Sequence, residues 1–139
     1  MKRGWLIVAV LAAGCAQAVS LDPPAPGGAA ATACQALAKR LPATIEGLAR
    51  TETDPVSPYT AVWGPGEIAL RCGVDRPASM EATAEVSDVN GVGWFADPAR
   101  PTLFTSVNRE AYVEVTISAN HQPGSVLVDL ADPIKATIP

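Results

Sequence analysis

The stretch Glu67-Ile-Ala-Leu-Arg-Cys-Gly-Val74 decides the fold. Ile68, Leu70, Cys72 and Val74 alternate with smaller or polar residues, which is the period-two pattern of a strand with one buried face. Cys72 falls on the buried side, so this strand is predicted to be both part of the core and a point of covalent attachment. The turn Gly64-Pro-Gly66 precedes it, and residues 60–63 predict the partner strand of a hairpin.

Further strands are predicted on both sides of this hairpin. Residues 111–118 alternate apolar and polar side chains most clearly, which indicates an antiparallel sheet with one covered face. Asn90-Gly91 is a strong hairpin signal between residues 82–89 and 92–95. Other expected strands span residues 43–50 and 103–107. The sequence therefore predicts an α+β domain with a mostly antiparallel sheet of five or six strands.

A helix is expected at each end of the domain, both on one face of the sheet. Thr32 is a suitable N-cap for the first helix, in which Cys34, Leu37 and Leu41 share one face. Asp132-Pro133 fits the N-cap and first position of the closing helix. Leu130, Ile134 and Ile138, spaced four apart, are expected to pack on the sheet.

The N-terminus has the form of an export signal. Lys2 and Arg3 precede an apolar run over residues 5–13, which is too short for the roughly 20 residues that cross a bilayer. Leu11-Ala-Ala-Gly-Cys15 resembles a lipobox, in which Cys15 carries the lipid after residues 1–14 are removed. The alternative is ordinary secretion after cleavage at Ala16-Gln-Ala18.

Length and composition limit the number of domains and indicate a linker. The 139 residues suffice for one domain, predicted over residues 33–139. Residues 15–32 are rich in Pro, Ala and Gly and are expected to be a flexible tether behind the lipidated cysteine. The formal charge is −4 and falls to −6 when Lys2 and Arg3 leave with the signal, so no nucleic-acid partner is expected and any membrane attachment depends on the lipid.

The two remaining cysteines, Cys34 and Cys72, form a matched pair on the packed faces of a helix and a strand. In an oxidising compartment they are expected to form a disulfide, and the alternative is two buried free thiols. Two cysteines this far apart with a single histidine make no metal-ligand set, so neither a metal nor another cofactor is expected.

Several segments together resemble an uncharacterised family of exported or membrane-attached actinobacterial domains, the domain of unknown function 3515. The resemblance covers about residues 34–139. It is carried by Cys34-Gln-Ala-Leu37 with Leu41-Pro42, Ala61-Val-Trp63-Gly64, Leu70-Arg-Cys-Gly-Val74 with Pro77, Gly91-Val92 with Trp94, and Arg109-Glu-Ala-Tyr-Val-Glu-Val115. It implies a compartment and a lineage, since the family has no established activity.

No catalytic motif is present, and no enzyme activity is predicted. His121, the only histidine, lies in a predicted loop without a nucleophile elbow. Paired carboxylates require two acidic side chains in one place, which sequence alone does not provide. The candidates are Glu67, Glu81, Glu85 and Glu114, and surface charge is the simpler interpretation.

A candidate binding surface comprises Trp63, Arg71, Trp94, Arg109 and Tyr112, because arginines beside exposed aromatics are typical of interfaces. The competing interpretation places both tryptophans in the core and pairs the arginines with Glu114 or Asp75. The sequence thus predicts a non-enzymatic binding or accessory module of the cell envelope, whose partner is an unidentified envelope protein or wall component. Alternatives are a small envelope hydrolase using carboxylates and a structural subunit of an envelope complex.

Overall fold

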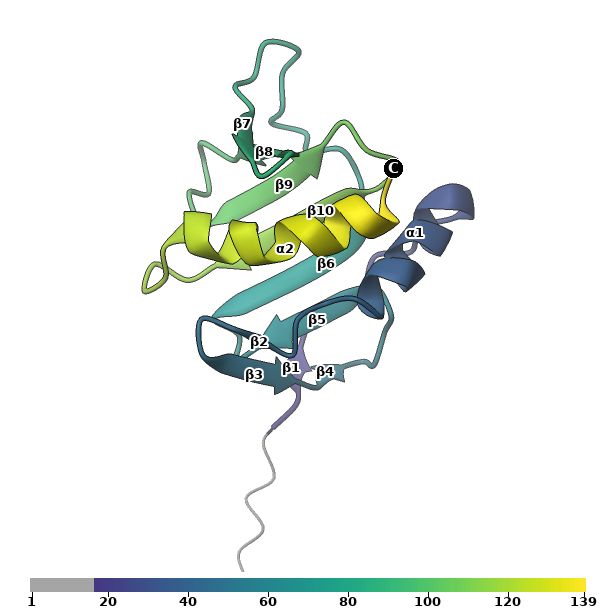
Figure 1. Cartoon of the computed structure of the whole chain (residues 1–139), viewed down its shortest axis with the longest axis vertical. Coiled ribbons are helices and arrows are strands. Elements are labelled where there is room, and N and C mark those ends of the chain that lie inside the picture. Colours follow the sequence, from purple (N-terminus) through teal and green to yellow (C-terminus); the bar gives the residue numbers. More distant parts are fainter. Residues whose placement is uncertain (1–16) are drawn as a thin grey trace, which may run out of the picture.

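The computed structural model describes residues 17–139, which form an eight-stranded sheet, a separate two-stranded pair and two helices (Figure 1). In chain order the elements are β1 (Val19–Ser20), α1 (Gly28–Ala38), β2 (Thr44–Ile45), β3 (Leu48–Thr51), β4 (Thr53–Asp54), β5 (Thr60–Trp63), β6 (Ile68–Val74), β7 (Ser87–Val89), β8 (Val92–Ala96), β9 (Leu103–Val107), β10 (Tyr112–Ile117) and α2 (Pro123–Thr137). The predicted signal peptide and Cys15 lie outside the described residues.

The large sheet has the order β2-β3-β5-β6-β10-β9-β8-β7, and every neighbouring pair is antiparallel. The α+β class is therefore confirmed. The predicted count of five or six strands was too low, since the sheet has eight; where one strand was expected over residues 43–50, the chain forms the two-residue strand β2 and then β3. Runs this short carry no usable periodicity.

The organising strand β6 occupies the centre of the sheet between β5 and β10. Ile68, Leu70 and Cys72 are buried, as the alternation predicted. The β5–β6 hairpin is confirmed, with Trp63 opposite Ile68. The Asn90-Gly91 hairpin is also confirmed: β7 and β8 pair antiparallel, and both turn residues have positive φ.

Both helices lie on one face of the sheet, in front of the strands in Figure 1. A single buried cluster joins them to it, and its members include Leu37 of α1, Val113 and Val115 of β10, and Ile134 of α2. The predicted bridge between α1 and β6 is present, since Cys34 and Cys72 form a disulfide with their Cα atoms 5.6 Å apart. The helix-and-sheet core is thus cross-linked at its centre.

The first helix begins earlier than predicted. It starts at Gly28 with Gly27 as N-cap, so Thr32 is not the cap but lies inside the helix, where its hydroxyl donates to the Gly28 carbonyl at 3.3 Å. The flexible tether predicted for residues 15–32 is wrong for the described part of that range. Backbone pairing of β1 and packing of Pro26 on Gly73 order this segment, and composition does not reveal either contact.

The closing helix also begins earlier than predicted. Pro123 opens it after the N-cap Gln122, and Pro133 lies inside it rather than at its first position. Proline removes one helix hydrogen bond. Leu130, Ile134 and Ile138 are nevertheless fully buried, as expected, and their packing stabilises the helix on both sides of Pro133.

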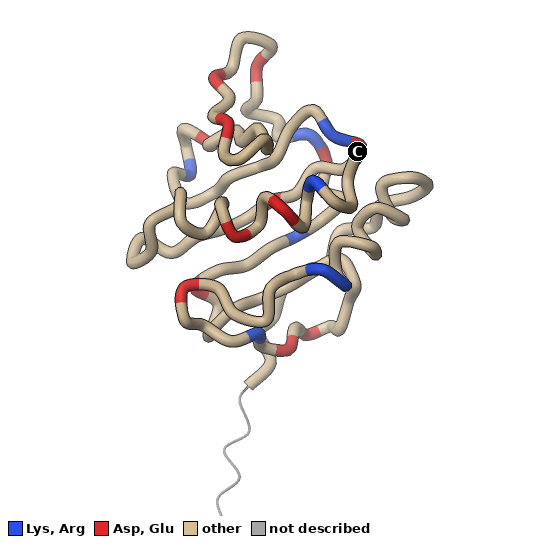
Figure 2. Tube along the Cα trace, in the orientation of Figure 1, with Lys and Arg blue, Asp and Glu red and all other residues tan. Residues whose placement is uncertain are grey.

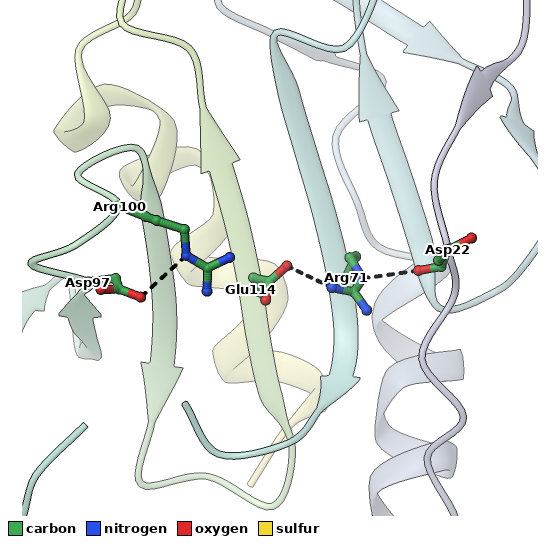
Figure 3. Close-up of polar contacts among 5 residues, drawn as sticks. All are labelled: Asp22, Arg71, Asp97, Arg100 and Glu114. Carbon is green, nitrogen blue, oxygen red and sulfur yellow. Dashed lines mark hydrogen bonds and ion pairs between the residues drawn. The ribbon is translucent and has the colours of Figure 1, made fainter. Parts of the chain in front are cut away.

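The opposite, helix-free face is not bare, contrary to the single-covered-face prediction. One part is crossed by the N-terminal segment, defined as residues 17–27. Another part is covered by the acidic loop, defined as residues 77–86, from which Met80 packs against Phe95 and Val107. Arg71 and Glu114 lie on this face between the two coverings (Figure 3).

Candidate binding surface

The predicted aromatic part of the binding surface does not exist, because both tryptophans are in the core. Trp63 is 0% exposed and Trp94 is 2% exposed. The Trp63 indole donates to the Pro42 carbonyl at 3.0 Å, and the Arg50 guanidinium lies over its ring at 5.2 Å from the centroid. Burial of both rings confirms the competing interpretation and corrects the binding-patch prediction.

The arginines of the predicted patch hold the chain together. Arg71 donates to Glu114 at 3.1 Å and to the backbone carbonyl of Asp22 at 3.0 Å, which joins β6, β10 and the N-terminal segment (Figure 3). Arg109 donates to the carbonyls of Ile138 at 2.7 Å and Gly91 at 3.0 Å. These contacts fix the start and end of the domain rather than offering free donors.

Tyr112, the last member of the patch, is half-buried. It lies at the start of β10 on the helix-free face, next to the small cluster formed by Met80, Phe95 and Val107. The five predicted residues are therefore divided among the core, the two coverings of the sheet and, for Arg109, the C-terminal end of the chain, and they do not form one surface.

A cavity of about 510 Å³ lies instead between the acidic loop, the edge strand β7 and its neighbour β8. Phe95 and Ala96 supply its apolar wall, and Pro98 closes one side. Hydroxyl and carboxylate groups make up most of the remainder, from Ser79, Glu81, Thr83, Glu85 and Ser87. Both carboxylates are exposed to water at the rim. We call this site the acidic cavity.

The acidic loop and β7 carry charge of one sign. Residues 77–89 contain Glu81, Glu85 and Asp88 but no Lys or Arg. Figure 2 shows acidic positions on the loop that stands out beyond β7 and β8, and Asp88 lies on β7 itself. A concave site with two carboxylates, three hydroxyls and an apolar wall suits a cationic or hydroxyl-bearing ligand.

Buried polar contacts hold the base of this region in place. Asp97 is 6% exposed; its carboxylate accepts from the Ala99 backbone N–H at 2.9 Å and lies 3.5 Å from the Arg100 guanidinium. The Ala99 N–H, helped by the Ser79 hydroxyl and Arg100, lowers the pKa of Asp97 below its ordinary value, although desolvation opposes this. Arg76 donates to the Met80 carbonyl at 2.9 Å and ties the loop to the end of β6.

Of the four glutamates singled out from the sequence, the structure brings only Glu81 and Glu85 to one cavity. Glu114 is paired with Arg71, and Glu67 is paired with His121 at 2.7 Å. Sequence reasoning interpreted all four as surface charge. The only signal that separates Glu81 and Glu85 is their place in a stretch without basic residues, which is weak by itself.

His121 is not the solvated loop residue that the sequence predicted. Its side chain is 14% exposed, and its contact with Glu67 joins the β5–β6 turn to the loop before α2. The backbone adds to this link, since Ser118 N–H donates to the Glu67 carbonyl at 2.8 Å. The pair has the geometry of a histidine–acid site, but neither residue lines the acidic cavity. Its evident role is to fasten two turns.

Among residues 17–139, no group of three or more His, Cys, Asp or Glu side chains is placed to hold a metal ion. No helix in this range is long and apolar enough to span a bilayer.

The fold and its cross-link define a small, disulfide-bonded α+β domain with an acidic cavity at one end. The chain matches the family described as "Protein of unknown function (DUF3515)" over residues 4–139, and it belongs to that family. No curated protein and no solved structure matches the chain. The family resemblance inferred from the sequence is thus confirmed.

Proposed function

We propose that this chain is an exported, non-enzymatic binding module of the cell envelope. Lipid on Cys15 holds it at the outer face of the cell membrane, with secretion after Ala18 as the alternative. The Cys34–Cys72 disulfide supports export, because such bonds persist in oxidising compartments. The formal charge of −6 that remains without Lys2 and Arg3 (8 − 14) supports attachment through lipid rather than through charge.

The acidic cavity is the observation that carries the binding role. It lies beside the exposed acidic loop, and it gathers Glu81, Glu85 and Phe95 in one concavity. Loops on a rigid scaffold are the usual place for recognition. The partner is therefore an envelope protein that presents a basic segment, or a wall component that carries amino and hydroxyl groups.

A carboxylate hydrolase is the second candidate, because two glutamates share the cavity. Glycoside hydrolysis needs one carboxyl that stays protonated in a desolvated setting and a second that stays ionised. Glu81 and Glu85 are both exposed to water, so their surroundings do not differ in this way. This observation favours binding over catalysis.

Replacing the proposed acylation site tests the location. In cells, Cys15→Ala is expected to move the protein from the membrane fraction to the medium or the soluble envelope fraction, since acyl chains then no longer attach it. Wild-type protein treated in parallel is the control. A Cys15→Ala variant that remains in the membrane fraction contradicts lipidation.

Capture of partners from envelope extract tests whether the acidic cavity is the binding site. The chain from residue 17 to 139 is used, because residues 17–32 belong to the folded domain. Partners retained by the wild type are expected to be lost with the double substitution Glu81→Gln and Glu85→Gln. The matched control is Glu52→Gln with Asp54→Asn, which makes the same change in charge at exposed positions elsewhere. Equal capture by both double variants contradicts a role for the acidic cavity.

A further inference from the structure

We infer that the β1–β4 end of the domain lies against the lipid headgroups and that the acidic cavity points away from the membrane. This inference rests on the proposed lipidation of Cys15. It replaces the picture of a domain on a long flexible tether by one of a domain held directly on the bilayer in a fixed orientation.

The number of residues between Cys15 and β1 limits how far the folded domain can lie from the lipid. Cys15 and Val19, the first residue of β1, are four residues apart, so a fully extended chain spans at most about 14 Å between them. The Val19 N–H donates to the Glu52 carbonyl at 2.8 Å, and the Leu21 N–H donates to the Asp54 carbonyl at 3.2 Å. The fold therefore begins almost at the lipid.

The N-terminal segment beyond β1 is also held, so no flexible joint follows the first strand. The Asp22 carbonyl accepts from Arg71 at 3.0 Å, and Pro26 packs over Gly73 of β6. Two consecutive prolines, Pro23 and Pro24, stiffen the chain between these contacts. The position of the first described residues thus determines the orientation of the whole domain.

The acidic cavity is at the opposite end of the molecule. β1 and β4 lie at the bottom of Figure 1, beside β3 and β5, whereas β7 and the acidic loop lie at the top. Trp63 on β5 and Trp94 on β8 are separated by four steps across the sheet. At about 4.8 Å a step, the two indoles lie roughly 19 Å apart along this axis.

Charge at the β1–β4 end provides no attraction to an anionic lipid surface. Asp22, Glu52 and Asp54 are exposed there and outnumber Arg50, which is exposed on the same hollow as Glu52. The one large apolar side chain in the loop after β4 is Val56, which is 86% exposed. A single valine contributes little membrane affinity, so the covalent lipid has to supply the attachment, and the chain without it is not expected to bind vesicles.

The disulfide makes a direct experiment practical. In the chain that begins at Cys15, Cys34 and Cys72 are bonded to each other, so Cys15 is the only free thiol and couples selectively to a maleimide lipid. Vesicles of phosphatidylcholine carry this lipid together with a dansyl-labelled headgroup lipid. Trp94→Phe leaves Trp63 as the sole energy donor, and Trp63→Phe leaves Trp94.

Energy transfer to the dansyl headgroups is expected to be several-fold more efficient from Trp63 than from Trp94. A Gly-Ser linker inserted between Gln17 and Ala18 is the control and should remove most of the difference. Equal transfer from both indoles, or stronger transfer from Trp94, overturns the inference.

A second measurement uses the unsubstituted sequence, in case a tryptophan variant does not fold. Hydrogen exchange of the coupled chain, compared with the free chain, should slow in residues 52–57 and stay unchanged in residues 79–87. Slowing confined to residues 79–87 overturns the inference. Because the coupling is synthetic, these results do not depend on lipidation in cells, which the Cys15→Ala fractionation tests by itself.

Discussion

The two halves of the sheet are built differently. In the half that runs from β2 to the central strand β6 both faces are covered: α1 is bonded to β6 through Cys34–Cys72, and Arg71 holds the N-terminal segment on the other face. At the β7–β9 end, the helix-free face is covered by the acidic loop alone. That loop rests on the small cluster around Met80 and leaves the acidic cavity beside it.

The two halves of the sheet therefore differ in role: one stabilises the fold, and the other carries the proposed binding site. The disulfide and the hydrogen bonds of Arg71 lie where the N-terminal segment joins the sheet, and the proposed lipid would hold this same segment. The acidic loop contains no cysteine and its two carboxylates are exposed, and exposed loops of this kind open locally at low free energy. A module attached by one end and binding with the other requires this distribution.

The strongest test of the comparison removes the disulfide. Replacing Cys34 and Cys72 together by Ala is expected to lower the free energy of unfolding by about 4 kcal/mol, because the bridge closes a loop with a sequence separation of 38. Urea denaturation measures the change. Hydrogen exchange should accelerate first in α1 and β6, and faster exchange limited to β7 and β8 contradicts the proposed division.

A smaller effect is expected from filling the space at Gly73. A Cβ atom there would overlap the Pro26 ring, and the backbone φ of +92° also disfavours a side chain. Gly73→Ala should therefore displace the N-terminal segment and lower the free energy of unfolding by roughly 1–3 kcal/mol. Faster proteolysis of residues 17–27 in the variant would locate the effect.

The matched control for this change is Gly124→Ala. Gly124 lies in the first turn of α2, where an added Cβ meets nothing within 4 Å. Alanine also has the better helix propensity, so this variant should be as stable as the wild type or slightly more stable. Equal losses in the two variants would show that the N-terminal segment is not held at Gly73.

The parts of this fold that the sequence predicted are those governed by local pattern. Strands β5, β6 and β9 have the predicted limits, and the β7–β8 hairpin follows from Asn90-Gly91. Alternation along β6 also placed Cys72 on the face where Cys34 meets it. In each case a short stretch contains its own evidence, because side-chain direction alternates strictly along a strand.

The predictions that were wrong concern segments whose structure depends on contacts with distant parts of the chain. The N-terminal segment has the composition of a linker and is ordered only because Gly73 and Arg71 lie beneath it. Pro133 signals a helix start, but the burial of Leu130 and Ile134 outweighs that signal. The acidic cavity forms where the acidic loop folds back over β8, and no spacing within residues 77–86 predicts that return.

The smallest expected effect is on the pH dependence of stability when Asp97, at the base of the acidic cavity, is replaced. Its folded pKa lies below the ordinary value of 3.8, so its ionised form is stabilised by folding. That contribution is complete above about pH 4 and is lost as the pH falls through the lower folded pKa. Asp97→Asn removes the charge that Ala99, Ser79 and Arg100 hold, so the variant is expected to be less stable near neutral pH and to lose less stability in acid. Urea midpoints measured from pH 7 to pH 2 test this, with Asp75→Asn, an exposed carboxylate near the same loop, as the control. If the wild type and Asp97→Asn have parallel midpoint curves over that range, the Asp97 contacts do not hold the base of the acidic cavity.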